Sequence, residues 1–233
     1  MKNISKLLAL VAFVWSLTAT SVLSEGKVGV VLGKGVWAAT GEETNIDNNT
    51  TDTAQTGSKS GTKDRKGHGA FTDTVQGIFA EYDNGPFSIG LQLNASVDTP
   101  EATNVQQSDA SGSTQNTNKV KASFANERMI YAIADAPVLG LYLKVGYSIV
   151  DVETKENLAT GATYADEETH GIHVGIGSEI DLGGASVRIE VMGSEYDDVS
   201  ATDGNSASDE TAKRVEISDM IGARATISLL KAF

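Results

Sequence analysis

The stretch Arg214–Phe233 alternates apolar and polar side chains with a period of two. Its apolar positions are Val215, Ile217, Ile221, Ala223, Ala225, Ile227, Leu229 and Phe233, and its polar positions are Glu216, Ser218, Gly222, Arg224, Thr226 and Ser228. Successive side chains of a β-strand point to opposite faces, so this pattern predicts a two-faced strand. A strand that ends on an exposed ring needs an apolar environment there, and a lipid bilayer provides one.

The same alternation recurs along the chain. It covers the ranges 27–38, 71–82, 87–97, 119–135, 141–149, 172–180 and 185–194. In the range 119–135 the parity changes between Phe124 and Met129, which predicts a β-bulge. Lys34 interrupts the apolar face of the first segment, and this predicts either a bulge or a lysine that reaches toward lipid head groups.

Long polar segments and tight turns alternate between these strands. The long segments are 41–69, 98–118, 153–169 and 197–212, and the turns are 83–86, 136–138 and 181–184. Eight antiparallel strands joined in this way predict an all-β, up-and-down transmembrane barrel with four long loops on one side and both termini on the other.

Composition agrees with this architecture. The chain has 24 glycines, 3 prolines and no cysteine, which suits long twisted strands and excludes disulfides and thiolate metal sites. Residues 1–24 combine Lys2 and Lys6 with an apolar run, so we expect a signal peptide ahead of a barrel domain at 25–233. The net charge of −13 then becomes about −15. This acidic balance argues against nucleic-acid binding.

A soluble barrel has its apolar face inside, whereas a membrane barrel has it outside. The polar faces carry charges of both signs among many glycines, which favours a narrow polar lumen and hence a membrane barrel. Buried charges must be paired, so we expect an ion-pair network that fills the lumen. Its predicted members are Glu81, Lys144, Glu179, Arg188, Glu190 and Arg224. A gated ion pathway through the same residues is the alternative.

The chain resembles the small outer-membrane β-barrel proteins of Gram-negative bacteria, typified by the OmpA transmembrane domain, OmpX and the opacity proteins. The matching motifs are GIFAEY (77–82), LYLKVGYS (141–148), GIGSEIDL (175–182), VRIEV (187–191) and the final strand.

This resemblance implies a location in the cell outer membrane, contact with the bilayer and lipopolysaccharide, and recognition of the terminal Phe233 by the barrel-assembly machinery. Lys231 departs from the family's terminal pattern, which has an aromatic or apolar residue there. Full-length OmpA-like proteins add a peptidoglycan-binding domain, and we expect none in this chain.

Catalysis is disfavoured. Some barrels that resemble this chain modify lipid A with a His and a Ser near the outer rim. Of the three histidines, His68 lies at the end of a predicted loop and His173 shares the parity of the polar face, so only His170 is placed to face lipid, with Ser194 or Ser200 as partner. We predict no catalytic residue and no cofactor.

A metal site is also not expected. The segment with Asp203, Asn205 and Asp209 lacks the glycine and the bidentate glutamate of a calcium loop. The sequence therefore predicts a surface-interaction or structural role, adhesin-like, through four extracellular loops and an unknown partner. A narrow porin-like channel for ions or small solutes is the alternative.

Overall fold

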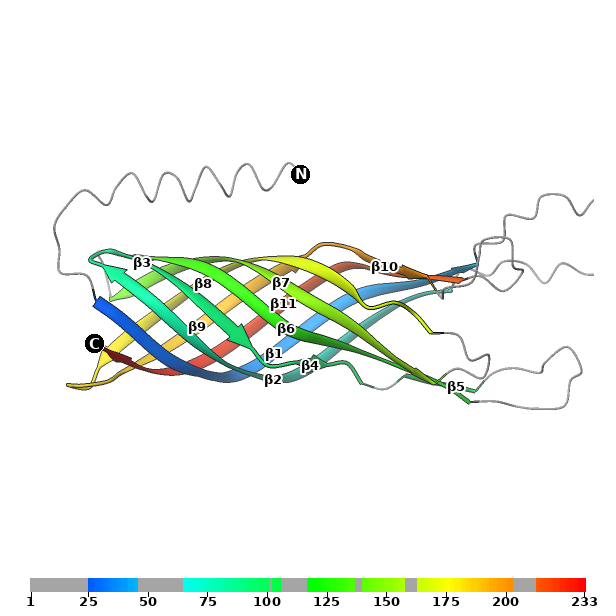
Figure 1. The fold of residues 1–233 in the computed structure, drawn as a ribbon, viewed down its shortest axis with the longest axis horizontal. Helices are drawn as coiled ribbons and strands as arrows, with labels where there is room; N and C mark the ends of the chain where they lie inside the picture. Colours follow the sequence, from blue (N-terminus) through cyan, green and yellow to red (C-terminus); the bar gives the residue numbers. More distant parts are fainter. Residues whose placement is uncertain are drawn as a thin grey trace, which may run out of the picture.

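The computed structural model describes residues 25–45, 65–100, 102–105, 117–136, 140–157, 163–202 and 213–233. These residues form one closed antiparallel sheet, elongated along the barrel axis (Figure 1). The barrel closes because β1 (Glu25–Asn45) pairs with β11 (Lys213–Ala232) from Lys27↔Ala232 to Asn45↔Lys213. The predicted eight-stranded antiparallel barrel is confirmed. The predicted signal peptide at 1–24 lies outside the described residues.

In the described residues, eleven strand segments make up the eight strands of the barrel. The others are β2 (Arg65–Asn84), β3 (Phe87–Asn94), β4 (Val97–Asp98), β5 (Ala102–Val105), β6 (Thr117–Asp135), β7 (Leu141–Asn157), β8 (Glu167–Asp181), β9 (Ser186–Tyr196) and β10 (Val199–Thr202). Strands β4 and β5 continue β3 along its neighbour β6, and β10 continues β9 along β11. No helix in the described part of the chain is long and apolar enough to cross a bilayer.

Several strands run beyond their predicted ends. Strand β1 continues to Asn45 and β2 begins at Arg65, both inside the segment predicted as a polar loop. Likewise β7 continues to Asn157 and β8 begins at Glu167. Cross-strand pairing holds these residues in place, and such pairing leaves no apolar periodicity in the sequence.

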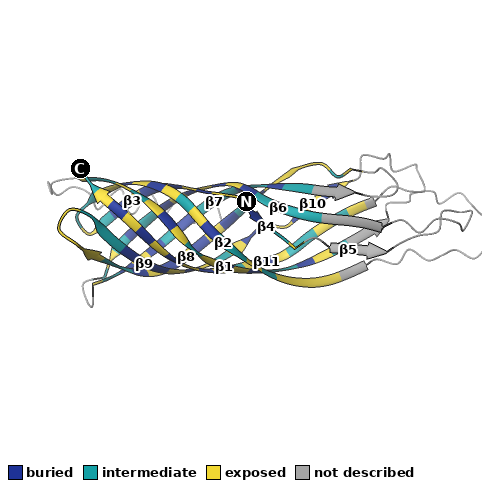
Figure 2. Ribbon diagram, turned by 90° about the horizontal axis from the view of Figure 1, so that it is seen from below, coloured by how far each residue is buried: buried dark blue, intermediate teal, exposed yellow. Residues whose placement is uncertain are grey.

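Exposed and buried residues alternate along the strands near the tight turns (Figure 2). The exposed ones include many large apolar side chains, which together form an apolar band. Val30, Leu91, Leu143, Ile176 and Ile227 are between 46 and 62 % exposed. A soluble surface rarely exposes a patch of this size, whereas a barrel in lipid requires one. The chain is therefore a membrane-spanning barrel of the outer-membrane type.

Bulges separate this band from the far end of the barrel. The register shifts between Ala125 and Arg128, with Asn126 at a φ of 51°, so the bulge predicted between Phe124 and Met129 is confirmed. The register of β1 shifts between Ala38 and Thr40 and is regular at Lys34, so the bulge considered at Lys34 is wrong. We call the barrel between turns and bulges the membrane half, and the part beyond the bulges the extension.

The final strand changes face at one of these bulges. Asp219 has a φ of 53°, and beside it Met220 is buried while Ile221 is 57 % exposed. Beyond this point Ile217 pairs with the buried Val199. The single apolar face predicted from Val215 to Phe233 is therefore interrupted, because one extra residue reverses the parity of the strand.

Candidate functional site in the barrel lumen

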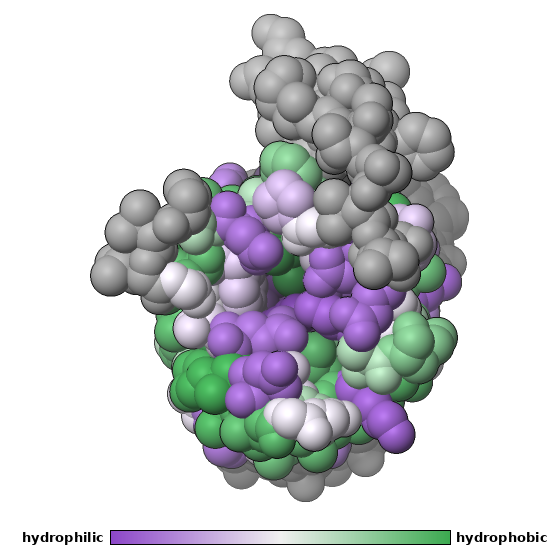
Figure 3. Space-filling model, turned by 90° about the vertical axis from the view of Figure 1, so that its left-hand side faces the viewer, coloured by the Kyte–Doolittle hydropathy of each residue, from purple (hydrophilic) through white to green (hydrophobic). Residues whose placement is uncertain are grey.

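Hydrophilic side chains surround a hollow at the turn end of the barrel (Figure 3). Lys27 Nζ lies 2.7 Å from Asp83 Oδ2 and 3.4 Å from Glu179 Oε1. Glu179 also accepts a hydrogen bond of 2.7 Å from Arg188 Nη2. This cluster of Lys27, Asp83 and Glu179 is partly exposed, and through Glu179 it contacts the buried charges above it.

Arg188 is the centre of the next layer. Its guanidinium forms a bidentate pair with Glu81, at 2.9 and 3.0 Å, and both side chains are buried. The hydroxyl of Tyr131 donates a further hydrogen bond of 3.0 Å to Glu81. A buried bidentate pair with additional donors compensates much of the cost of removing both charges from water.

Lys144 joins this layer to the one above it. Its ammonium donates to Glu190 Oε1 and Gln92 Oε1, both at 3.2 Å, and lies 4.1 Å from the ring centroid of Tyr131. Tyr142 donates to the second oxygen of Glu190 at 2.9 Å. The predicted network residues Glu81, Lys144, Glu179, Arg188 and Glu190 thus meet in one connected cluster.

The sixth predicted member, Arg224, pairs elsewhere. Its Nη1 lies 3.1 Å from Glu127 Oε2, and Glu127 also accepts a bond of 2.6 Å from Asn94. The acids of the predicted network were Glu81, Glu179 and Glu190, and Glu127 was not among them. Glu127 directly follows the bulge at Asn126, so its face could be assigned only once the bulge had been located.

His173 lies next to Glu127 and is fully buried. Its Nε2 lies 2.7 Å from Ser148 Oγ and 3.6 Å from Glu127 Oε1, while its Nδ1 lies 2.7 Å from Ser194 Oγ. The prediction that His173 faces the polar interior is confirmed.

His170 is on the opposite face of the wall. Its ring stacks on Tyr147, with 5.7 Å between centroids. Ser194 points inward to His173. The pair of His170 and Ser194 considered for lipid modification is therefore divided by the barrel wall. Asp203, Asn205 and Asp209 lie outside the described residues.

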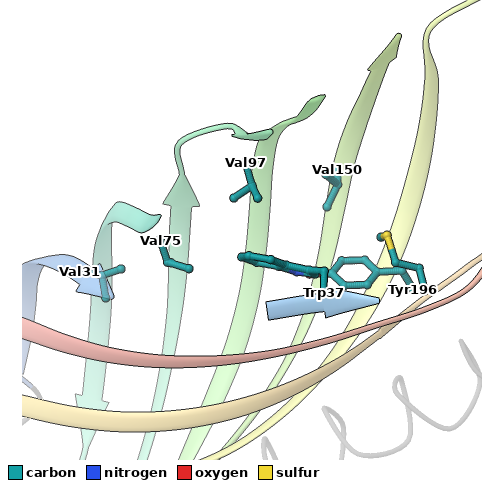
Figure 4. Close-up of a cluster of buried hydrophobic side chains, with 7 residues drawn as sticks. Val31, Trp37, Val75, Val97, Val150 and Tyr196 are labelled. Carbon is teal, nitrogen blue, oxygen red and sulfur yellow. The ribbon is translucent and has the colours of Figure 1, made fainter. Parts of the chain in front are cut away.

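Above the charges the lumen becomes apolar (Figure 4). The cluster comprises Val31, Trp37, Val75, Val97, Val150, Tyr196 and Met220, with Ala39, Phe71 and Phe124 packed against it. Trp37 stacks on Phe71, which stacks on Phe124, at centroid distances of 5.5 and 6.0 Å. This cluster is absent from the sequence-based prediction, in which the interior of the whole barrel is polar.

Lumen glycines make room for aromatic rings. A Cβ on Gly90 would lie 2.3 Å from the Tyr131 ring, and one on Gly177 would lie 2.2 Å from the Tyr142 hydroxyl oxygen. Both tyrosines are hydrogen-bonded members of the charged network. These glycines therefore let the rings lie flat across the wall and close the lumen.

A cavity of about 20 Å³ lies between the charged and apolar layers of the described lumen. Its lining residues are Trp37, Ala95, Val97, Phe124, Glu127, Val150, Tyr196 and Met220. Such a volume holds about one water molecule. The described residues therefore fill the lumen at two levels, with charges in the membrane half and apolar rings at the base of the extension.

Comparisons with known proteins find only distant similarity, to outer-membrane proteins. The sequence matches no protein-family profile and no curated protein. Among solved structures, Neisserial surface protein A is similar at 8 % identity and a TM-score of 0.35, over 88 % of this chain and 99 % of that one. The outer-membrane protease OmpT of Escherichia coli is similar at 11 % and 0.40, over 93 % and 100 %. The translocator domain of NalP from Neisseria meningitidis is similar at 10 % and 0.30, over 99 % and 96 %. The fold assignment rests on the strand pairing described above.

Proposed function

We propose that this protein is a non-conducting, non-catalytic outer-membrane scaffold that acts through its extracellular side, in the manner of an adhesin. The observation that carries the proposal is the filled lumen. A solute passing from the turn end would have to break the bidentate pair of Arg188 and Glu81 and then displace the stacked rings of Trp37 and Phe71. Neither barrier is needed for a pore, whereas both stabilise a rigid support.

The exterior of the extension is the candidate interaction surface. Its outward side chains are polar and include Asp98, Asp151 and Glu168, in contact with Lys121 or Arg128. Function in proteins of this build commonly resides in surface segments held by a rigid scaffold. The strongly acidic chain, at −13, favours cationic or hydrogen-bonding partners over anionic ones.

Planar-bilayer recording of the refolded chain tests the non-conducting part. We expect no steady openings from the wild type. The double variant Trp37→Ala with Phe71→Ala removes the apolar layer, and Glu81→Ala with Arg188→Ala removes the central pair. If the wild type conducts steadily and conductance changes with the central-pair variant, the porin-like alternative replaces the scaffold.

A binding assay tests the surface role. Cells that display the chain should adhere to host-cell or matrix-coated surfaces more than cells without it. Neutralising Asp151→Asn and Glu168→Gln in the extension should reduce this adhesion. Neutralising Asp135→Asn and Asp181→Asn at the turn end, which faces the periplasm, should leave it unchanged. Equal loss in both sets would place the interaction elsewhere.

A further inference from the structure

One lysine lies on the lipid-facing side of the apolar band. Lys34 is exposed, and along the same face of β1 its neighbours Leu32 and Val36 are 60 and 45 % exposed. On the neighbouring strand β11 it pairs with Ala225, between the exposed Ile221 and Ile227. A charge on the lipid face of a barrel is destabilising, and most so toward the middle of the bilayer. Lys34 therefore needs a compensating partner.

The partner within the chain is neutral. Lys34 Nζ donates a hydrogen bond of 2.9 Å to the Thr74 hydroxyl on β2. Two outward cations of the extension boundary differ in this respect, because Arg128 is paired with Asp151 and Lys121 with Asp98. Thr74 orients the ammonium and leaves its charge unneutralised, since a hydroxyl oxygen carries no net charge.

Polar groups surround this lysine on one side. Thr72, Thr74 and Gln76 lie on the same outward face of β2, opposite Val36, Lys34 and Leu32 of β1. We call Lys34, Thr72, Thr74 and Gln76 the polar patch. Its hydroxyl and amide groups can donate hydrogen bonds, and together with one ammonium they match an anionic, oxygen-rich group.

The outward apolar run is shorter on β2, at this patch, than on β7. On β7 the outward positions stay apolar from Leu141 to Ile149, and the first carboxylate is Asp151. On β2 the apolar run from Tyr82 ends at Ile78, because Gln76 is already polar. Where a band is short, the bilayer thins and its head groups come closer to the turn end. The patch thus meets head groups rather than acyl chains.

We propose that the polar patch binds the phosphorylated head group of an outer-leaflet lipid, the phosphate of lipid A, with Lys34 as the phosphate contact. A second copy of the chain is a poorer occupant, because a two-fold contact centred on this patch would place two unneutralised lysines together. The patch is independent of the filled lumen, so this inference goes beyond the proposed scaffold role.

The test is thermal unfolding of the refolded chain in maltoside micelles, followed by the heat-modifiable gel band and by Trp37 fluorescence. Adding lipid A should raise the midpoint of the wild type by several degrees, and dephosphorylated lipid A should raise it less. Lys34→Met should lose this phosphate-dependent rise, and Lys34→Arg should retain it. Lys231→Met is the matched control, because Lys231 is an exposed lysine at the opposite end of the barrel.

A second readout separates binding from folding. Without lipid, Lys34→Met should be at least as stable as the wild type, because the substitution removes a charge from an apolar surface. An equal lipid A response in wild type and Lys34→Met would overturn the proposal. So would an equal rise with inorganic phosphate, which would indicate a free-anion site, or crosslinking through residue 34 to a second copy.

Discussion

The membrane half directs polar side chains inward and apolar side chains outward, and the extension does the reverse on the same strands. Strand β7 shows this without any bulge. In the membrane half it buries Lys144 and exposes Leu143, whereas in the extension it buries Val150 and Val152 and directs Asp151 outward. The backbone geometry is continuous across the change, so the surrounding solvent accounts for the difference.

The side-chain arrangement of each half follows from the medium that surrounds it. In the membrane half, lipid accepts apolar side chains, so the polar face turns inward and its charges must pair. In the extension, water lies outside, and the barrel gains stability by burying apolar rings as soluble barrels do. The boundary lies near Glu127, where the last ion pair lies next to the cavity below the apolar cluster.

The largest effect should come from breaking the ion pair at this boundary. Glu127→Ala leaves Arg224 buried without a carboxylate, and we expect a loss of about 3–5 kcal/mol in the free energy of unfolding. Urea titration in lipid vesicles measures this loss. The double variant Glu127→Met with Arg224→Met removes both charges and should recover most of the stability. A double variant as unstable as the single one would contradict the pairing argument.

Removing the apolar core of the extension should come next. Trp37→Ala deletes a ring that is 7 % exposed and stacked on Phe71, at a cost of about 3 kcal/mol. The loss should be local, because the charged network below is intact. Hydrogen exchange should accelerate in the upper parts of β1 and β2 and stay slow in β7 near Lys144. Tyr82→Ala, a lipid-facing aromatic change, is the control and should leave both regions protected.

The division of the barrel into a membrane half and an extension explains which features could be predicted from the sequence. The strand count, the hairpin order and the bulge near Asn126 were predictable, because alternation and turn residues are local signals. All six predicted network charges lie in the lumen, since parity places them inside, and five of them meet in one cluster. The partner of Arg224 was not predictable, because Glu127 pairs with it across a bulge and 97 positions along the chain.

The apolar interior of the extension was not predictable, for a different reason. A single parity along the chain offers a soluble barrel and a membrane barrel only as alternatives. That parity puts Val97 on the same lipid-facing side as Leu91 and Leu93, whereas Val97 is buried in the lumen. Two bulges reverse parity near this level, at Asn126 and Asp219, so a single face in the sequence becomes two faces in space.

A charge placed on the outside should distinguish the halves. Ile176→Arg introduces a cation into the apolar band, and we expect a loss of roughly 2–4 kcal/mol if the position lies near the bilayer midplane. Ser200→Arg introduces the same cation on the exposed outer face of the extension, where water solvates it, and should change stability by less than about 0.5 kcal/mol. Vesicle unfolding of both variants measures the difference, and equal losses would displace the proposed membrane boundary.

The smallest effect should come from an ion pair outside the barrel. Arg128 lies 2.8 Å from Asp151, and its side chain is 52 % exposed, in contrast to the 3 % of Arg224. Arg128→Ala should therefore cost less than about 1 kcal/mol, because water and salt screen the pair. Raising the salt to about 1 M should remove even this difference, since screening then acts within about 3 Å. The loss caused by Arg224→Ala should persist at the same salt concentration. If Arg128→Ala were as costly and as insensitive to salt, the pair would lie in lipid, and the boundary between the two halves would lie beyond Asp151.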